Sequence, residues 1–267
     1  MGMASKHLLK DMTFVEFRER MARSTPVILI PLGSQEEQGP TAPMGDWMLA
    51  EALAAEVAKR ADAIAAPTIP FGFGDYFRPV PGGVQLRAAT MRALLRDVID
   101  NFLDHGLDRL LIFNGHTGNN PCIDEVSRLV RAERGVVVPW LNIWRSITPE
   151  IWREAHGPDA AKAQGHGADP LTSVYMHIFP ALLRPDLAAA PNPGGTVAGL
   201  PTAGLTGVKF RGIEIHAPVT VADHAPNGIV GGDPARASAA AGERIARHVI
   251  DTGVALVQHL ATADLKG

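Results

Sequence analysis

Continuous apolar runs alternate with amphipathic stretches along this chain. Residues 27–32 (VILIPL) are all apolar, which is typical of a strand buried on both faces. After a turn-rich stretch, Leu49, Leu53 and Val57 recur at four-residue spacing, and this period predicts an amphipathic helix beginning at Asp46. A buried strand followed by a helix is therefore the first unit that the pattern indicates.

The same order repeats through the first half of the chain. Short connections between alternating strands and helices favour right-handed βαβ units, and hence a parallel sheet covered by helices. Thr90 and Gly106 are expected to begin and end one of these helices. The further strands are predicted at residues 63–69, 109–113 and 136–143, and the further helices at about residues 90–103 and 121–134.

The last third of the chain does not continue the alternation of strands and helices. Residues 185–207 are rich in Pro, Gly, Ala and Thr and predict an ordered excursion, because strand-like alternation follows at 208–221. Asp233 followed by Pro234 is a helix-start signal for a final helix to about residue 260. The chain shows neither an internal repeat nor a domain boundary, so we expect a single domain over residues 1–267.

Composition narrows the function classes. Of the 267 residues, 46% are apolar and 20% charged, with a net charge of −3, as in a globular protein and unlike a disordered one. Without a Lys/Arg stripe, nucleic acid is not an expected partner, and the apolar runs fall short of the roughly 18 residues of a membrane span. Residues 1–10 lack the apolar core of a secretory signal, and the one cysteine, Cys122, excludes an internal disulfide. We therefore expect a cytoplasmic enzyme that acts on a small molecule.

Polar residues gather where predicted strands end. In open α/β sheets ligands bind beyond the carboxyl ends of the strands, and two loops meet this rule. A later glycine-rich segment, which precedes an apolar helix, adds another histidine and carboxylate. Oxygen and imidazole donors of this kind suit Zn, Mn or Fe. The alternative interpretation is that Asp46 and Asp169 only cap helices and that His116 is an ordinary turn residue. The candidate residues are Glu36, Glu37, Gln38 and Asp46, then Asn114, His116 and Asn119, and last His166 and Asp169.

Five segments, in order, resemble the creatininase (creatinine amidohydrolase) family. Pro31 to Pro40 (PLGSQEEQGP) resembles the signature P-x-G-S-x-E-Q-H-G-P-H, and residues 113–119 (FNGHTGN) resemble N-G-H-G-G-N. Residues 81–86 (PGGVQL) resemble F-P-G-T-x-S-L, residues 166–173 (HGADPLTS) resemble H-A-G-E-x-E-T-S, and residues 232–234 match a late G-D-P. Each match is weak alone, but five in the correct order are specific to the family.

The resemblance implies a three-layer α/β/α fold with a mostly parallel central sheet. It also implies homo-oligomers, often hexamers, and a divalent metal centre that hydrolyses amide-type C–N bonds. By the same resemblance Glu36, Asp46 and His116 are metal ligands, with Asp46 placed after a one-residue gap. Trp144 corresponds to a tryptophan near the substrate, and His166 to a histidine that handles a proton.

The chain departs from the family where relatives carry histidine. A histidine ligand of the second metal is replaced by Gln38, and two further family histidines are replaced by Thr41 and Phe77. A glutamate that binds the second metal in creatininase corresponds to Gly118. A neutral amide is a poorer ligand than imidazole, so we expect one firmly held ion, with Glu37 as partial compensation. We therefore expect a substrate other than creatinine.

The leading hypothesis is a metal-dependent hydrolase of an amide or cyclic amide. Glu37 or Asp169 would take a proton from water, and His166 would donate to the leaving nitrogen or stabilise the oxyanion. Two other interpretations stay open: a metal-dependent lyase, isomerase or hydrolase of a sugar-like substrate, and a ligand-binding descendant without activity. The residues expected to contact the substrate are Trp144, Tyr76 and Arg78.

Overall fold

The computed structural model describes residues 6–266 and contains a parallel four-stranded sheet in the order β2-β1-β3-β4. Residues 1–5, part of the segment considered above as a leader, lie outside the described residues. All three pairings are parallel, with Ile30 beside Ile112 at the centre of the sheet. The strands are β1 (Ile28–Leu32), β2 (Ile64–Ala65), β3 (Leu110–Asn114) and β4 (Trp140–Asn142).

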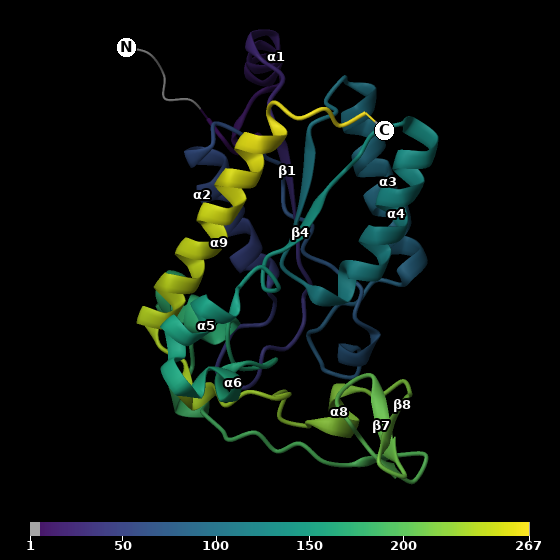
Figure 1. The fold of residues 1–267 in the computed structure, drawn as a ribbon, viewed down its shortest axis with the longest axis vertical. Coiled ribbons are helices and arrows are strands. Elements are labelled where there is room, and N and C mark those ends of the chain that lie inside the picture. The colour runs from purple at the N-terminus through teal and green to yellow at the C-terminus, as the bar shows by residue number, and fades with distance from the viewer. Residues whose placement is uncertain (1–5, 267) are drawn as a thin grey trace.

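Helices cover both faces of this sheet. Figure 1 shows α2 (Trp47–Arg60) and α9 (Ala239–Leu260) on one side of the strands, and α3 (Ala88–Asp104) and α4 (Asn120–Arg134) on the other. The prediction of a three-layer α/β/α fold with a parallel central sheet is thus confirmed.

The apolar runs are continuous because each central strand packs against helices on both faces. Side chains alternate along a strand, so Leu29 joins the hydrophobic cluster under α2 and α9, while Ile28 and Ile30 join the cluster under α3 and α4. On β3 the same alternation sends Phe113 to the first cluster and Ile112 to the second. All five side chains are buried.

Several element boundaries differ from those predicted. β2 and β4 keep only the part of their apolar runs that pairs with a neighbouring strand. Thr90 is not a cap, because α3 already begins at Ala88. Asp233 caps only a short 3-10 turn, and α9 begins later, where the Ser238 side chain accepts a hydrogen bond from the backbone of its first turn.

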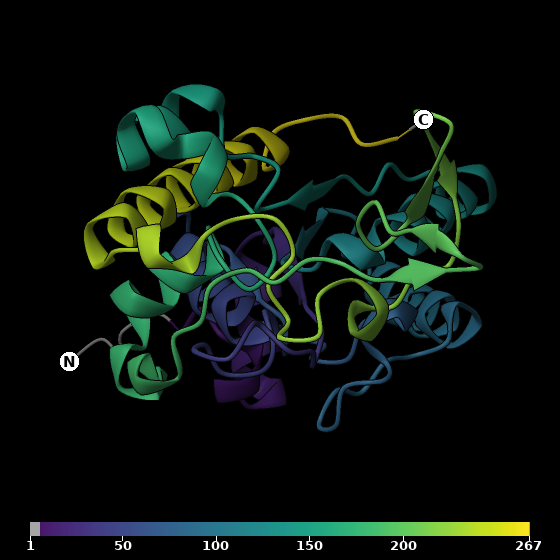
Figure 2. The ribbon, with the colours of Figure 1, turned by 90° about the horizontal axis from the view of Figure 1, so that it is seen from below.

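The remaining elements gather at one end of the sheet, as the views in Figures 1 and 2 show. α1 (Phe14–Arg23) lies at the opposite end. Within residues 6–266, no helix combines the length and apolar character needed to cross a membrane. The gathered elements are helices α5 (Pro149–His156), α6 (Ala160–Ala163), α7 (Leu171–Ile178) and α8 (Val221–His224), with the hairpins β5 (Thr196–Val197)–β6 (Leu200–Pro201) and β7 (Gly207–Phe210)–β8 (Ile213–His216).

Candidate metal centre

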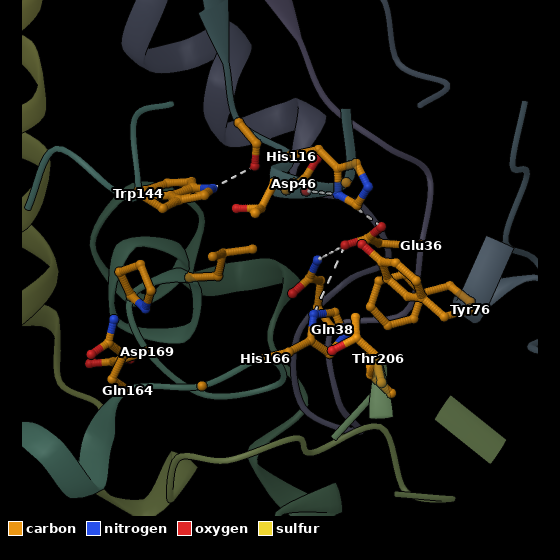
Figure 3. Close-up of a pocket in the computed structure, with 18 residues that line it drawn as sticks. Glu36, Gln38, Asp46, Tyr76, His116, Trp144, Gln164, His166, Asp169 and Thr206 are labelled. Atoms are coloured by element: carbon orange, nitrogen blue, oxygen red, sulfur yellow. Dashed lines mark hydrogen bonds and ion pairs between the residues drawn. The ribbon is translucent and has the colours of Figure 1, made fainter. Parts of the chain in front are cut away.

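Three predicted ligands meet beyond the carboxyl ends of the two central strands. Glu36 lies in the loop after β1, Asp46 directly precedes α2, and His116 follows β3. One ligand atom from each residue lies within 4.8 Å of the other two, and all three side chains are buried. Figure 3 shows them converging on one corner of a pocket. Because β1 and β3 are parallel neighbours, residues 80 positions apart in the sequence emerge side by side.

The two ring nitrogens of His116 have different partners. Nδ1 lies 3.0 Å from Oδ2 of Asp46 and 3.0 Å from Oε2 of Glu36. Nε2 lies 3.0 Å from the backbone carbonyl oxygen of Phe73. A hydrogen bond from Nε2 to a carbonyl leaves Nδ1 as the metal-binding nitrogen, which is the usual orientation of a ligand histidine.

The surrounding backbone fixes these side chains. Oδ1 of Asp46 accepts a hydrogen bond of 2.6 Å from the amide of Ser34, and the helix-capping hydrogen bond of the alternative interpretation is not formed. Gly33 permits this contact, because a Cβ there would lie 2.3 Å from the Trp47 backbone. Asn119 accepts a hydrogen bond of 2.8 Å from the amide of Phe73 and thereby holds the carbonyl that faces His116.

Burial of these charges shapes the electrostatics. Burial, assisted by the nearby Glu36 carboxylate, raises the pKa of Asp46 to about 7 in spite of His116. Burial alone would lower the pKa of His116, but the two carboxylates raise it well above its usual value. Oε2 of Glu36 is buried without a well-oriented hydrogen-bond donor. A divalent cation would neutralise both carboxylates and use this oxygen, so the residues present fit a metal ion.

Gln38 lies beside this trio at the position of the missing family histidine. Its Nε2 donates a hydrogen bond of 3.0 Å to Oε1 of Glu36, while its own Oε1 is buried without a partner. Gly118 leaves no space for a side chain, since a Cβ would lie 2.4 Å from His116 Nε2 and 2.4 Å from the Phe73 carbonyl. The described residues therefore offer neither imidazole nor glutamate for a second ion at these two positions.

Glu37 and His166 form a separate pair at the edge of the pocket. Nε2 of His166 lies 2.8 Å from Oε1 of Glu37, whose Oε2 accepts a hydrogen bond from the amide of Gly39. The ring of Phe77 stacks on His166 with centroids 4.3 Å apart. Burial lowers and Glu37 raises the pKa of His166, with a net increase. The other ring nitrogen, Nδ1, lies 4.0 Å from Oε1 of Glu36, so His166 faces the metal trio.

Asp169 is separated from the metal trio. Its carboxylate accepts hydrogen bonds from the amide and hydroxyl of Ser173 in the first turn of α7, and lies 2.9 Å from Nε2 of His156. In Figure 3 it lies beside Gln164, across the pocket from Glu36 and His116. The alternative interpretation, that this aspartate stabilises the start of a helix, agrees with these contacts.

The pocket has a volume of about 360 Å³ and receives two of the three predicted substrate contacts. Tyr76 and Trp144 line it, and the indole Nε1 of Trp144 donates a hydrogen bond of 2.5 Å to the carbonyl of Gly115. Arg78 does not line the pocket; its exposed guanidinium lies 3.3 Å from Asp75.

Sequence reasoning missed one backbone group that orients His116 and two residues that line the pocket. The Phe73 carbonyl carries no signal in the sequence because it is a backbone group. Leu205 and Thr206 line the pocket from the loop before β7, about 90 residues after the His116 motif along the chain. The Gly115–His116 motif was a usable signal, whereas this loop offered only its turn-rich composition.

Comparisons with known proteins identify the family of this chain. A sequence model of the creatininase family, described as creatinine amidohydrolase, matches residues 10–257. The chain is 29% identical over 248 residues to a mycofactocin precursor peptide peptidase of Mycobacterium ulcerans, covering 87% of this chain and 84% of that protein. It is 25% identical over 228 residues to a 3-dehydro-scyllo-inosose hydrolase of Thermotoga maritima, covering 84% and 70%.

The fold also matches a solved structure. A crystal structure of creatinine amidohydrolase (creatininase) superposes with a TM-score of 0.80 at 22% identity, covering 98% of this chain and 100% of that one. The α/β/α architecture is therefore shared over the full length of the matched protein.

Proposed function

This chain belongs to the creatininase family of metal-dependent hydrolases, and from that premise we propose that it cleaves an amide-type C–N bond in a small molecule. The observation that carries the proposal is the convergence of three buried ligand atoms, from Glu36, Asp46 and His116, within 4.8 Å of one another. Exposed acidic clusters are common, but two carboxylates buried together with an imidazole are costly without a cation.

We propose that these three residues hold one Zn, Mn or Fe ion. When bound, such an ion activates water as a nucleophile near neutral pH and polarises the substrate carbonyl. The hydrogen bond from Gln38 to Glu36, and the lack of space at Gly118, support a single firmly held ion. They also support a substrate other than creatinine.

His166 is the proposed proton carrier. Its Nε2 is bound by Glu37, so its Nδ1 is the atom that faces the metal trio and the substrate. Burial lowers and the Glu37 carboxylate raises the pKa of His166, and the net increase favours the protonated ring that donation to a leaving nitrogen requires. Glu37 is then a positioning residue, and Asp169, which is bound by Ser173 and His156, holds the wall of the pocket.

Metal analysis tests the site. The purified wild-type chain is expected to contain close to one divalent ion, and the Glu36→Gln and His116→Ala variants much less, as measured by elemental mass spectrometry. The control is Asp75→Asn, which changes an exposed carboxylate outside the trio and should retain the ion. Full metal content and full hydrolysis of an amide panel in both ligand variants would contradict the assignment.

A second candidate is a hydrolase of a sugar-like ketone, as the similarity to the Thermotoga maritima enzyme suggests. The same metal trio and His166 would serve a lyase or isomerase reaction on such a substrate. Parallel assays of amides, short peptides, lactones and cyclic polyol ketones distinguish these reactions by the product formed. The family resemblance also supports a homo-oligomer, which light scattering tests.

A further inference from the structure

A second cavity adjoins the metal pocket. It has a volume of about 520 Å³, and three residues, Tyr76, Leu205 and Thr206, line both cavities. Beyond this shared wall it is formed by Asp75 and by residues 216–220, the end of β8 and the segment that leads to α8. In Figure 3 Tyr76 and Thr206 lie on the same side of the metal pocket, near Gln38 and His166.

The shared wall is anchored to the fold. The amide of Ala217 donates a hydrogen bond of 3.0 Å to the carbonyl of Thr206, and the amide of Ala203 donates one of 2.8 Å to the carbonyl of Gly207. These two hydrogen bonds fix the loop at residues 203–207 to the β7–β8 hairpin. The ring of Tyr76 packs edge-on against Phe77 with centroids 4.6 Å apart. These contacts hold the residues of the shared wall in fixed positions.

Tyr76 lines both cavities. Its hydroxyl lies close to the metal trio, since a Cβ on Gly118 would be 2.7 Å from it, and burial raises the pKa of this phenol. The same side chain borders the second cavity. A molecule that contacts the Tyr76 ring while its reacting group faces His116 would extend naturally toward Ala217.

The lining of the second cavity is mainly apolar. Leu205, Ala217, Pro218 and Val219 contribute aliphatic surface. The polar side chains in the lining are those of Tyr76, Thr206, Thr220, the exposed His216 and Asp75, and Asp75 is paired with Arg78 at 3.3 Å. Burying an apolar group against such surface is favourable in proportion to the area removed from water. The cavity thus favours an uncharged hydrocarbon group over an ionic one.

We propose that the second cavity is a subsite for an apolar substituent, of about the size of a phenyl or branched alkyl group, carried by the substrate several bonds from the reacting carbonyl. The inference rests on the proposed function, because the metal pocket is taken to hold the reacting group. It specifies a substrate class: amides that are longer than a compact ring and carry a hydrophobic end.

Calorimetric titration of the zinc-loaded full chain tests this subsite. Hydroxamates chelate divalent ions, so acetohydroxamate probes the metal pocket alone and 4-phenylbutanohydroxamate probes both cavities. The wild type is expected to bind the longer probe at least tenfold more tightly. Ala217→Trp fills only the second cavity and should remove this gain, while the Kd of acetohydroxamate changes less than twofold.

Matched controls complete the design. Ala89→Trp, at an exposed position of α3, should keep the full gain, and the smaller change Ala217→Leu should reduce it to an intermediate value. 6-Aminohexanohydroxamate, of similar reach but cationic, should show no gain. An equal gain for this probe, an undiminished gain in Ala217→Trp, or no gain in the wild type would overturn the proposal.

Failure of the proposed function has different results. If the trio holds no metal, acetohydroxamate does not bind to the wild type, and if a bound metal serves another reaction, acetohydroxamate binds but no amide of the assay panel is cleaved. The phenyl-bearing probe then still reports on the subsite, because its binding to the wild type and loss in Ala217→Trp support the second cavity. Equal binding to both proteins would refute it.

Discussion

Without a bound metal ion, the stability of this protein should depend on pH near neutrality. In the metal-free state the pKa of Asp46 is about 7, mainly because of burial, against 3.8 for the exposed group. An acid with a raised pKa in the folded state holds its proton there while the unfolded chain has lost it. Stability therefore falls as pH rises from about 4 to 7 and is constant above.

The magnitude follows from the pKa difference. Each pKa unit corresponds to about 1.4 kcal/mol, so the rise from pH 5.5 to 8 should cost the metal-free protein about 2 kcal/mol through Asp46 alone. His116 acts in the same direction, because its contribution is present in full below pH 6.5 and is lost as pH rises through its raised folded pKa. Starting at pH 5.5 keeps surface carboxylates, such as the half-buried Glu16 with a pKa of about 2, ionised throughout.

Urea unfolding at pH 5.5 and pH 8, with chelator and with saturating zinc, measures this effect. Bound metal requires deprotonated ligands, so the stability gap between loaded and metal-free protein should widen by at least about 2 kcal/mol at the higher pH. Asp46→Asn retains an oxygen acceptor for the Ser34 amide and should lose most of the pH dependence in chelator. Equal free energies of unfolding of the metal-free wild type at both pH values would refute the reasoning.

Three further predictions follow from the site. Gln38→His should raise the metal content from one toward two ions per chain in elemental analysis, and a content that stays at one would show that Gln38 does not limit the second ion. Gly228→Ala would place a Cβ 2.0 Å from Oε2 of Glu37, at a residue whose φ is +76°. This substitution should lower the free energy of unfolding in urea by about 1–3 kcal/mol more than Gly106→Ala, because Gly106 has the same φ but open space around it. Equal losses in the two variants would show that the clash with Glu37 is not what destabilises the protein. Arg78→Ala should change kcat/KM less than twofold, because this arginine is exposed and lies outside the pocket lining. A tenfold loss of kcat/KM would indicate that Arg78 contacts the substrate.

The positions of the buried strands were predictable from the sequence because burial on both faces requires unbroken apolar runs. Residues 27–32 and 109–113 needed no tertiary information, since the pattern of side chains repeats every two residues on a strand. The boundaries at Thr90 and Asp233 were wrong, because a capping residue is only one of several weak local signals and helix packing decides where the helix begins. The apolar pattern therefore predicts where an element lies more accurately than a single capping residue predicts where the element begins.

The metal trio was predictable only in part. Glu36, Asp46 and His116 each follow or precede a predicted element, and the family resemblance singled them out. Their roles in metal binding remain predictions to be tested as described above. Glu37 and His166 lie 129 positions apart in the sequence. Neither of the segments around these residues indicates that their side chains are in contact.

The sequence by itself determined the layers of this protein and the chemistry available at the ends of its strands. Both depend on local properties, namely the period of apolar residues and the donor atoms of nearby side chains. Only the tertiary structure decided that Gln38 binds Glu36, that the Phe73 carbonyl orients His116, and that the loop at Thr206 lines two cavities. These contacts link distant segments whose relative positions result from the summed packing of the whole core, which no local pattern encodes.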